Sequence, residues 1–136
     1  MMIPLIELKS IRKSYGKKRV LDALNLKVYK GDFLGILGVS GSGKSTLMNI
    51  LLGIDDFDEG SYKLNNMEIN EISNLSRFRI DTINMIFQSY NLIRELTVRE
   101  NILLPGLYYK KSGSIDFKRL EEVTDLLGLH DILDQD

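Results

Sequence analysis

Residues Gly38–Thr46, GVSGSGKST, combine the residue types that a polyphosphate-binding loop needs: three glycines, three serines, one threonine and one lysine. Phosphate oxygens are bound by successive backbone N–H groups that point into one concavity, and side chains resist the backbone conformations that this requires. Gly41 and Gly43 remove that steric cost. Lys44 adds a compact positive charge that can reach the β- and γ-phosphates of a nucleotide. The stretch therefore predicts a site for a nucleoside triphosphate.

The spacing from Gly38 to Ser45 matches G-x-x-x-x-G-K-S. In that motif the serine hydroxyl, here Ser45, ligates Mg²⁺. We expect Thr46 to contact the α-phosphate side, and the helix that follows to favour anions through its unpaired N–H groups and its dipole. The expected nucleotide-binding positions of the loop are Gly38, Ser40, Gly41, Ser42, Gly43, Lys44, Ser45 and Thr46.

The segments on both sides of the loop suit this role. Phe33–Gly38 is a short apolar run without alternation, which predicts a strand buried on both faces. Lys44–Leu52 has the apolar spacing of a helix, and Gly53 is its expected C-terminal stop. The residues expected to face the core are Leu47, Ile50 and Leu51. A buried strand, a glycine loop and an amphipathic helix in this order predict an α/β fold around the phosphate site.

An antiparallel β layer is expected beside this unit. Ala23–Tyr29 alternates between two faces and predicts a half-buried, antiparallel strand, and Ile3–Leu8 predicts another. Ser61–Leu64 and Met67–Ile69 flank an Asn-Asn pair, which favours a hairpin turn.

The second half of the chain predicts one more strand and three helices. Thr82–Phe87 is an apolar run expected to be a strand, and Ser73–Arg79 a short helix. Thr97–Glu100 is a capping box that should open a helix ending before Pro105. A last helix is expected from a cap at Ser114 to a stop at Gly128, with an apolar stripe of Phe117, Leu120, Val123, Leu126 and Leu127.

Composition limits the classes of protein to which the chain can belong. With 136 residues, 43% of them hydrophobic, the chain can form one domain with a modest core. The formal net charge of −1 gives no reason to expect nucleic-acid binding. Cysteine is absent, which excludes disulfides and thiolate zinc sites. The first residues lack the basic region and the cleavage site of a signal peptide, so we expect a cytoplasmic protein.

Several stretches together resemble one family. GVSGSGKSTLMNILLG resembles the Walker A motif of ATP-binding-cassette (ABC) ATPases, and KSYGKKRVLDALNLKVYKGDFLGILG is similar to the start of these cassettes. INMIFQSYNLIRELTVRENILLP looks like their Q-loop region. The resemblance implies an incomplete P-loop NTPase core, of the α/β class, with an N-terminal antiparallel β subdomain and part of a helical subdomain. Residues 1–88 would hold the β region and the Walker A core, and residues 89–136 the start of the helical subdomain.

The resemblance also implies roles for residues outside the loop. Tyr15 would stack on the adenine, and Val20 would pack near the ribose and the base. Gln88 would touch Mg²⁺ and the attacking water, which makes it both a catalytic and a metal-binding candidate. Val39 stands where many family members have proline, but that position offers only backbone to a ligand.

The Q-loop region suggests a subfamily. LSRFRIDTINMIFQSYNLIRELTVRENILLP resembles ATP-binding subunits that work with FtsX-like permeases in lipoprotein-release, macrolide-export and antimicrobial-peptide-resistance systems. This resemblance implies ATP and Mg²⁺ as cofactors and a homodimer of ATP-binding subunits. It also implies an FtsX-like permease as the membrane partner, and a cytoplasmic location, peripheral on the inner face of the cell membrane.

Some motifs that ABC ATPases need for hydrolysis do not occur in the sequence. It contains no L-S-G-G and no four-residue apolar run ending in D-E, so the signature and the Walker B motif are not represented, and the switch histidine is also missing. We expect the chain to be the N-terminal part of such a domain, and to hydrolyse ATP alone at a rate near zero. A non-catalytic nucleotide-binding or regulatory fragment, and a truncated product without function, remain alternatives. A GTPase would need an N-K-x-D motif, which the sequence lacks.

Overall fold

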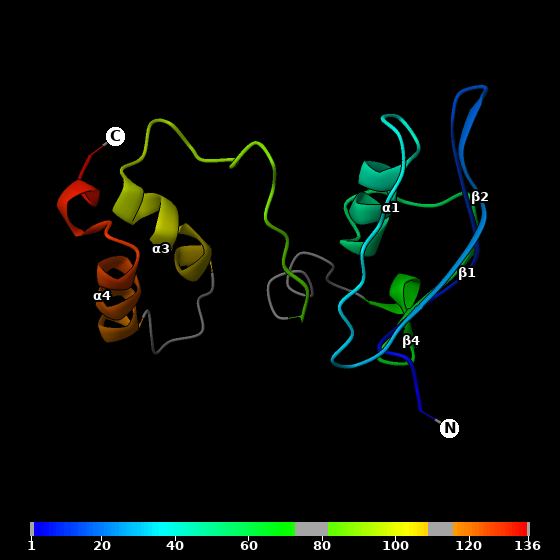
Figure 1. The fold of residues 1–136 in the computed structure, drawn as a ribbon, viewed down its shortest axis with the longest axis horizontal. Helices are drawn as coiled ribbons and strands as arrows, with labels where there is room; N and C mark the ends of the chain where they lie inside the picture. The colour runs from blue at the N-terminus through cyan, green and yellow to red at the C-terminus, as the bar shows by residue number, and fades with distance from the viewer. Residues whose placement is uncertain (1, 73–81, 109–115, 136) are drawn as a thin grey trace. The chain divides into compact units, whose positions relative to one another are not determined.

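The computed structural model describes residues 2–72, 82–108 and 116–135. They belong to two compact units, Met1–Met85 and Ile86–Asp136 (Figure 1). The helix predicted over Ser73–Arg79 and the cap predicted at Ser114 lie outside the described residues. The assignment of residues 1–88 and 89–136 to two parts of one cassette stays a prediction.

A four-stranded antiparallel sheet, in the order β2-β1-β3-β4, forms one layer of the first unit. Its strands are β1 (Ile6–Tyr15), β2 (Lys18–Val28), β3 (Glu59–Leu64) and β4 (Met67–Glu68). The strand predicted at Ile3–Leu8 begins only at Ile6 and continues to Tyr15, and the one predicted at Ala23–Tyr29 begins earlier, at Lys18, and ends at Val28. The two strands meet in a hairpin. The extra length of β1 was missed because register shifts between Leu8 and Ser14 interrupt its alternation of inward and outward residues.

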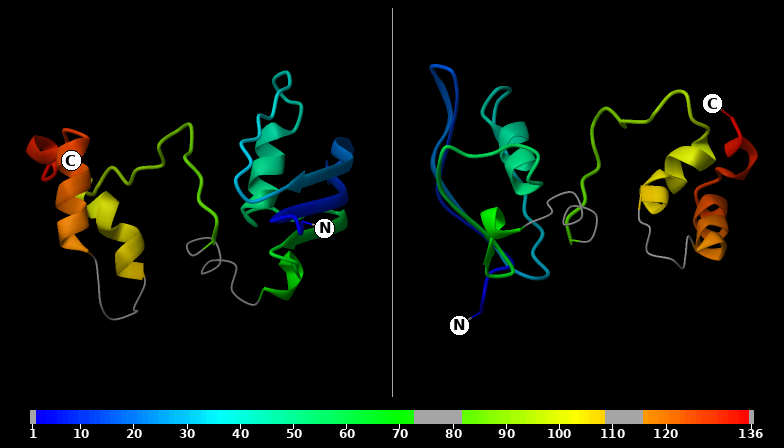
Figure 2. Two further views of the ribbon diagram at one scale, coloured as in Figure 1. Left: turned by 60° about the horizontal axis from the view of Figure 1, so that its bottom comes forward. Right: turned by 180° about the vertical axis from the view of Figure 1, so that it is seen from behind.

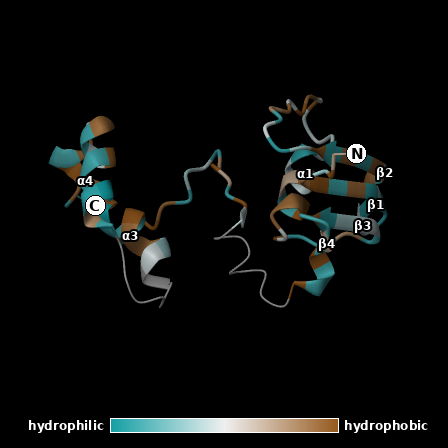
Figure 3. Ribbon diagram, turned by 90° about the horizontal axis from the view of Figure 1, so that it is seen from below, coloured by the Kyte–Doolittle hydropathy of each residue, from teal (hydrophilic) through white to brown (hydrophobic). Residues whose placement is uncertain are grey.

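Helix α1 (Lys44–Leu51) covers one face of this sheet (Figures 1 and 2). The predicted inward residues Leu47, Ile50 and Leu51 are buried in a core with apolar residues of β1, β2 and β3. Figure 3 shows apolar residues on α1 and on the strands beside it. Gly53 ends the helix as predicted, with φ 63°. Because the glycine loop leads directly into α1, the packing of α1 against the sheet fixes the C-terminal end of the loop.

Tyr62 joins β3 to the end of α1. Its side chain is fully buried, and its hydroxyl donates a hydrogen bond of 2.8 Å to the carbonyl oxygen of Leu51. Burial disfavours the phenolate and raises the pKa of Tyr62 to about 12. This bond satisfies one of the carbonyl groups that the last turn of a helix leaves without a partner.

The predicted hairpin after α1 is confirmed. β3 and β4 are joined by Asn65 and Asn66, which have φ values of 49° and 65°. Two residues with positive φ match the twist of the flanking strands, and asparagine tolerates that conformation better than most residues. A short 3₁₀ helix, η1 (Ile69–Glu71), follows and buries Ile69.

Two predicted strands are wrong. Residues 33–38 and 83–87 have no regular secondary structure, Thr82 is helical, and neither segment pairs with a strand in the part of the chain that the structure describes. Some of their side chains are fully exposed, with Phe33 at 103% and Ile86 at 98%, whereas Ile36, Ile83, Met85 and Phe87 are half-buried. An apolar run indicates a tendency to be buried, whereas a strand also requires a neighbouring backbone to which it can hydrogen-bond.

The described residues of the second unit form two α-helices, α3 (Val98–Tyr108) and α4 (Phe117–Leu126), and a 3₁₀ helix, η2 (His130–Ile132). The capping box at the start of α3 is confirmed. The backbone N–H of Thr97 donates to the Glu100 carboxylate at 2.9 Å, and the backbone N–H of Glu100 donates to the Thr97 hydroxyl at 3.2 Å. The predicted end before Pro105 is wrong, because α3 continues to Tyr108. Its first turn is anchored, since Arg99 N–H donates to the Leu133 carbonyl at 2.8 Å, and one bond lost at a proline does not have to end a helix.

Helix α4 has a different cap from the one predicted. Asp116 is its N-cap, and the carboxylate accepts a 3.0 Å hydrogen bond from the backbone N–H of Arg119. The predicted stop at Gly128 is confirmed by its φ of 67°. The predicted apolar stripe is only partly covered, because Phe117, Leu126 and Leu127 are exposed. Among the helices that the structure describes, none is long and apolar enough to cross a membrane.

Candidate functional site

The glycine loop has the backbone that its sequence predicts. Gly41 and Gly43 have φ values of 77° and 92°, which side-chain-bearing residues rarely adopt. A Cβ atom on Gly43 would also lie 3.0 Å from the carbonyl oxygen of Val20 and 3.0 Å from the side chain of Leu21. Gly43 is the N-cap of α1, and no side chain caps the helix there. The N–H groups of the first turn are therefore left for a ligand or for water.

Lys44 crosses over this loop. Its ammonium donates hydrogen bonds to the carbonyl oxygens of Gly38 at 2.7 Å and Val39 at 2.8 Å. Its Nζ atom also lies 3.4 Å from the Ser42 hydroxyl oxygen. Gly38 leaves room for this arrangement, because a Cβ atom there would lie 2.6 Å from that oxygen. Gly38 and Ser42 therefore shape the loop and hold the positive charge of Lys44 above it.

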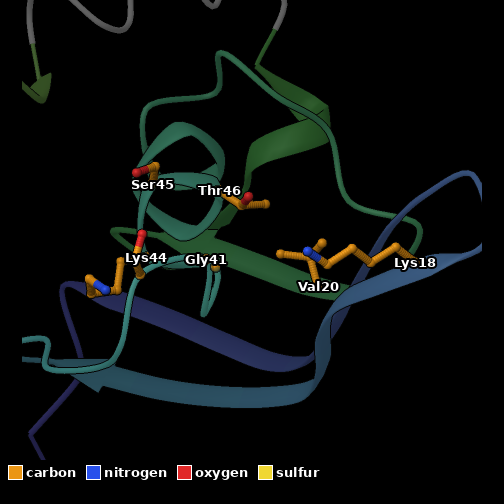
Figure 4. A pocket seen from close by; sticks show the side chains of 8 residues that line it. Lys18, Val20, Gly41, Lys44, Ser45 and Thr46 are labelled. Atoms are coloured by element: carbon orange, nitrogen blue, oxygen red, sulfur yellow. The ribbon is translucent and has the colours of Figure 1, made fainter.

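A cavity of about 360 Å³ opens beside the loop. Its lining residues are Lys18, Val20, Ser40, Gly41, Gly43, Lys44, Ser45 and Thr46 (Figure 4). The lining carries two lysines, three hydroxyl groups and no acidic residue, and it includes the first turn of α1. Such a donor set fits a polyanion. The hydroxyl of Ser45 is exposed and fits Mg²⁺, which commonly takes one or two protein ligands and completes its shell with phosphate oxygens and water.

Lys18 is the residue of this cavity that sequence reasoning missed. In the sequence Lys17–Arg19 is a short basic run, which by itself favours a solvated turn. Lys18 instead lies on β2, two residues before Val20, and both line the cavity. Residues two apart on a strand point to the same face, so the prediction for Val20 could have included Lys18.

Tyr15 is not among the residues that line the cavity, although it is paired across the hairpin with Lys18. Its hydroxyl donates a hydrogen bond to the carboxylate of Asp55, and its side chain is 49% exposed. Lys13 donates to the same carboxylate at 2.7 Å. These bonds hold the pKa of Asp55 below its ordinary value, because Lys13 and then Tyr15 stabilise the charged form.

Gln88 belongs to the second unit, where it lies in a turn and is exposed. Its contact with Mg²⁺ and water stays a prediction. The structure thus brings together Val20, Gly41, Gly43, Lys44, Ser45, Ser40 and Thr46 around one cavity, with Gly38 and Ser42 supporting the loop.

A profile described as "ABC transporter" matches residues 21–136. The chain belongs to the ABC transporter family. This match includes the glycine loop, α1 and every cavity residue except Lys18 and Val20.

Relatives of this ABC chain include transport ATP-binding proteins. It is 43% identical over 131 residues to the macrolide export ATP-binding/permease protein MacB of Mannheimia succiniciproducens. The aligned region covers 92% of this chain and 20% of MacB. It is 39% identical over 137 residues to the bacitracin export ATP-binding protein BceA of Halalkalibacterium halodurans. The aligned region covers 96% of this chain and 54% of BceA. The chain therefore spans about half or less of the length of these relatives.

The fold of this ABC chain also matches solved structures. MJ0796, described as a bacterial ABC transporter cassette in a dimeric structure, superposes with a TM-score of 0.81 at 32% identity. The match covers 95% of this chain and 60% of the MJ0796 chain. A second structure of MJ0796, bound to ADP and Pi, gives a TM-score of 0.80. The chain has the fold of part of an ABC ATPase cassette, as predicted.

Proposed function

We propose that this chain binds Mg-ATP in the cavity beside the glycine loop, as part of the energising ATPase subunit of an ABC transporter. The observation that carries the proposal is the cavity itself. It combines an uncapped helix N-terminus, two glycines with positive φ and the ammonium of Lys44. These groups match the negative charge and the size of a triphosphate.

Each side chain has a role in this proposal. The loop N–H groups and Lys44 hold the phosphates, and the Ser45 hydroxyl holds Mg²⁺. Val20 packs against the ribose and the base, and Tyr15 stacks on the base. Gln88 contacts Mg²⁺ and orients the attacking water. We propose ATP hydrolysis for the whole protein. This reaction depends on charged groups positioned around the γ-phosphate.

The partners belong to the same proposal. We infer a homodimer of ATP-binding subunits, because the MJ0796 cassette forms a dimeric structure. We infer an FtsX-like permease as the membrane partner and a peripheral location on the cytoplasmic face of the membrane. The names of MacB and BceA, an ATP-binding/permease protein and an ATP-binding protein for export, support a permease partner. Its FtsX-like kind is proposed from the resemblance of the Q-loop region.

A titration of the full-length protein with ATP and Mg²⁺ tests the binding step. Lys44→Ala should weaken ATP binding by at least about tenfold, because a charge-assisted hydrogen bond to phosphate contributes roughly 1.5–3 kcal/mol. Lys17→Ala is the matched control, since Lys17 is an exposed lysine outside the cavity lining, and it should bind ATP like the wild type. The proposal is wrong if wild type does not bind ATP, or if Lys44→Ala binds it equally well.

A further inference from the structure

Lys13, Tyr15 and Asp55 form a cluster of side chains outside the cavity lining. The two oxygens of the Asp55 carboxylate have different partners: Oδ1 accepts from Lys13 Nζ at 2.7 Å, and Oδ2 accepts from the Tyr15 hydroxyl. The same Nζ atom lies 5.1 Å from the centroid of the Tyr15 ring. The ring is therefore restrained at its hydroxyl and covered on one face by an ammonium group.

Asp55 is itself held by the helix that follows the glycine loop. The carbonyl oxygen of Asn49, in α1, accepts hydrogen bonds from the backbone N–H of Ile54 at 2.9 Å and of Asp55 at 3.3 Å. Helix α1 thus carries the phosphate-binding turn at its N-terminus and the partner of Tyr15 just after its C-terminus. The tyrosine and the loop are fixed to one element.

We propose that Asp55 is a positioning residue for the nucleobase: by binding the Tyr15 hydroxyl and the Lys13 ammonium, it holds the Tyr15 ring so that its free face stacks on the base. This inference rests on the proposed function, in which the phosphates occupy the glycine loop. Neither Asp55 nor Lys13 touches the nucleotide in this arrangement. Both act through the ring of Tyr15.

The energetics of the cluster favour a ring that is ordered before the nucleotide arrives. Tyr15 is half exposed, so without a partner its ring would sample several orientations and would lose that freedom on binding. The Tyr15 bond goes to a charged acceptor, which makes it stronger than a bond between neutral groups. Lys13 is only 9% exposed, and a charge at that depth requires an ionic partner. The cluster therefore persists in the empty site.

Binding of ATP and of inorganic tripolyphosphate to the full-length protein separates this role from a structural one. Asp55→Ala should weaken ATP binding about fivefold to tenfold, a part of the stacking free energy of one base. It should leave tripolyphosphate binding unchanged, because that ligand has no base. Asp56→Ala, which removes the same charge from the exposed neighbour, should leave both unchanged.

Tyr15→Phe provides a second variant that keeps the ring and the pair between Lys13 and Asp55. It should weaken ATP binding to a similar extent, and the double variant with Asp55→Ala should bind ATP no more weakly than either single one. The inference is wrong if Tyr15→Phe binds ATP like wild type, or if Asp55→Ala weakens ATP equally in both backgrounds. Equal loss of ATP and tripolyphosphate binding would also overturn it. A wild-type protein that binds neither ligand would overturn the proposed function itself.

Discussion

At the scale of single residues, the loop and its surroundings differ in how far the sequence predicts them. Gly43 is predictable because its positive φ is set by the local backbone of the loop, whereas its close approach to Val20 depends on β2. Lys18 can be predicted only together with β2, because it lines the cavity as the residue two before Val20 on that strand. Its charge is thus a contribution of the fold rather than of the motif.

Lys18→Ala should weaken ATP binding about fivefold, or about 1 kcal/mol, as expected for one partly exposed ionic contact. The loss should shrink as salt is added, since exposed charges are screened. Equilibrium titrations with ATP at two ionic strengths measure both effects. Lys17→Ala removes the same charge from a residue outside the cavity lining, and it should show neither effect. If both variants lose the same amount of ATP affinity, Lys18 contributes only to the overall positive charge of the hairpin and makes no specific contact.

At the scale of elements, the sequence predicts best what neighbours along the chain determine. The Asn-Asn turn, the stops at Gly53 and Gly128 and the capping box at Thr97 depend on residues within one turn of each other, and all four are present. The strands predicted at Phe33–Gly38 and Thr82–Phe87 depend on distant backbone, and they are absent from the described part. Local chemistry therefore predicts the ends of elements, whereas pairing is decided by the whole sheet.

The contact between β3 and α1 provides a test of element packing. Tyr62→Phe should lower the free energy of unfolding by about 1–2 kcal/mol, because it leaves the buried carbonyl of Leu51 without its donor while keeping the ring in the core. Denaturant unfolding measures the change. Tyr29→Phe is a control on a tyrosine outside the buried core, and it should change the stability by no more than about 0.5 kcal/mol. A Tyr62→Phe protein as stable as wild type would mean that water replaces the hydroxyl.

The pair between Lys13 and Asp55 connects β1 to the segment after α1, and its contribution should depend on pH at both extremes. The pKa of Asp55 lies below its ordinary value of 3.8, so its contribution is present above that pH and is lost as pH falls through the folded-state pKa. The pKa of Lys13 is raised above 10.5, mainly by its hydrogen bond to Asp55, so its contribution is present below that pH and is lost as pH rises through the folded-state pKa.

Unfolding of wild type and Asp55→Ala across the pH range measures this contribution. The difference in free energy of unfolding should be constant between about pH 5 and pH 9, where both groups are charged in either state. It should shrink below about pH 3.8, as the carboxylate takes up a proton. Asp56→Ala should show no such profile if the effect belongs to the pair. A difference that stays the same down to strong acid would mean that the carboxylate contributes by packing and not by charge.

At the scale of the whole molecule, the segment that leads into the glycine loop presents uncovered apolar surface. Phe33 and Leu37 are 103% and 96% exposed, and Leu34 and Val39 beside them are exposed as well. A soluble chain with clustered apolar side chains of this size associates with other apolar surface. We expect the 136-residue chain to bind a dye such as ANS in its native state and to self-associate as its concentration rises.

The double variant Phe33→Ser with Leu37→Ser should reduce both dye fluorescence and self-association in sedimentation velocity. It should change the free energy of unfolding by no more than about 0.5 kcal/mol, because exposed side chains contribute little to the folded state. The double variant Ile54→Ser with Met67→Ser, at two exposed apolar residues outside this segment, is the matched control and should leave association unchanged. If the double variant instead unfolds more readily, Phe33 and Leu37 contribute to the packing of the folded protein, and the prediction that they cause association is wrong.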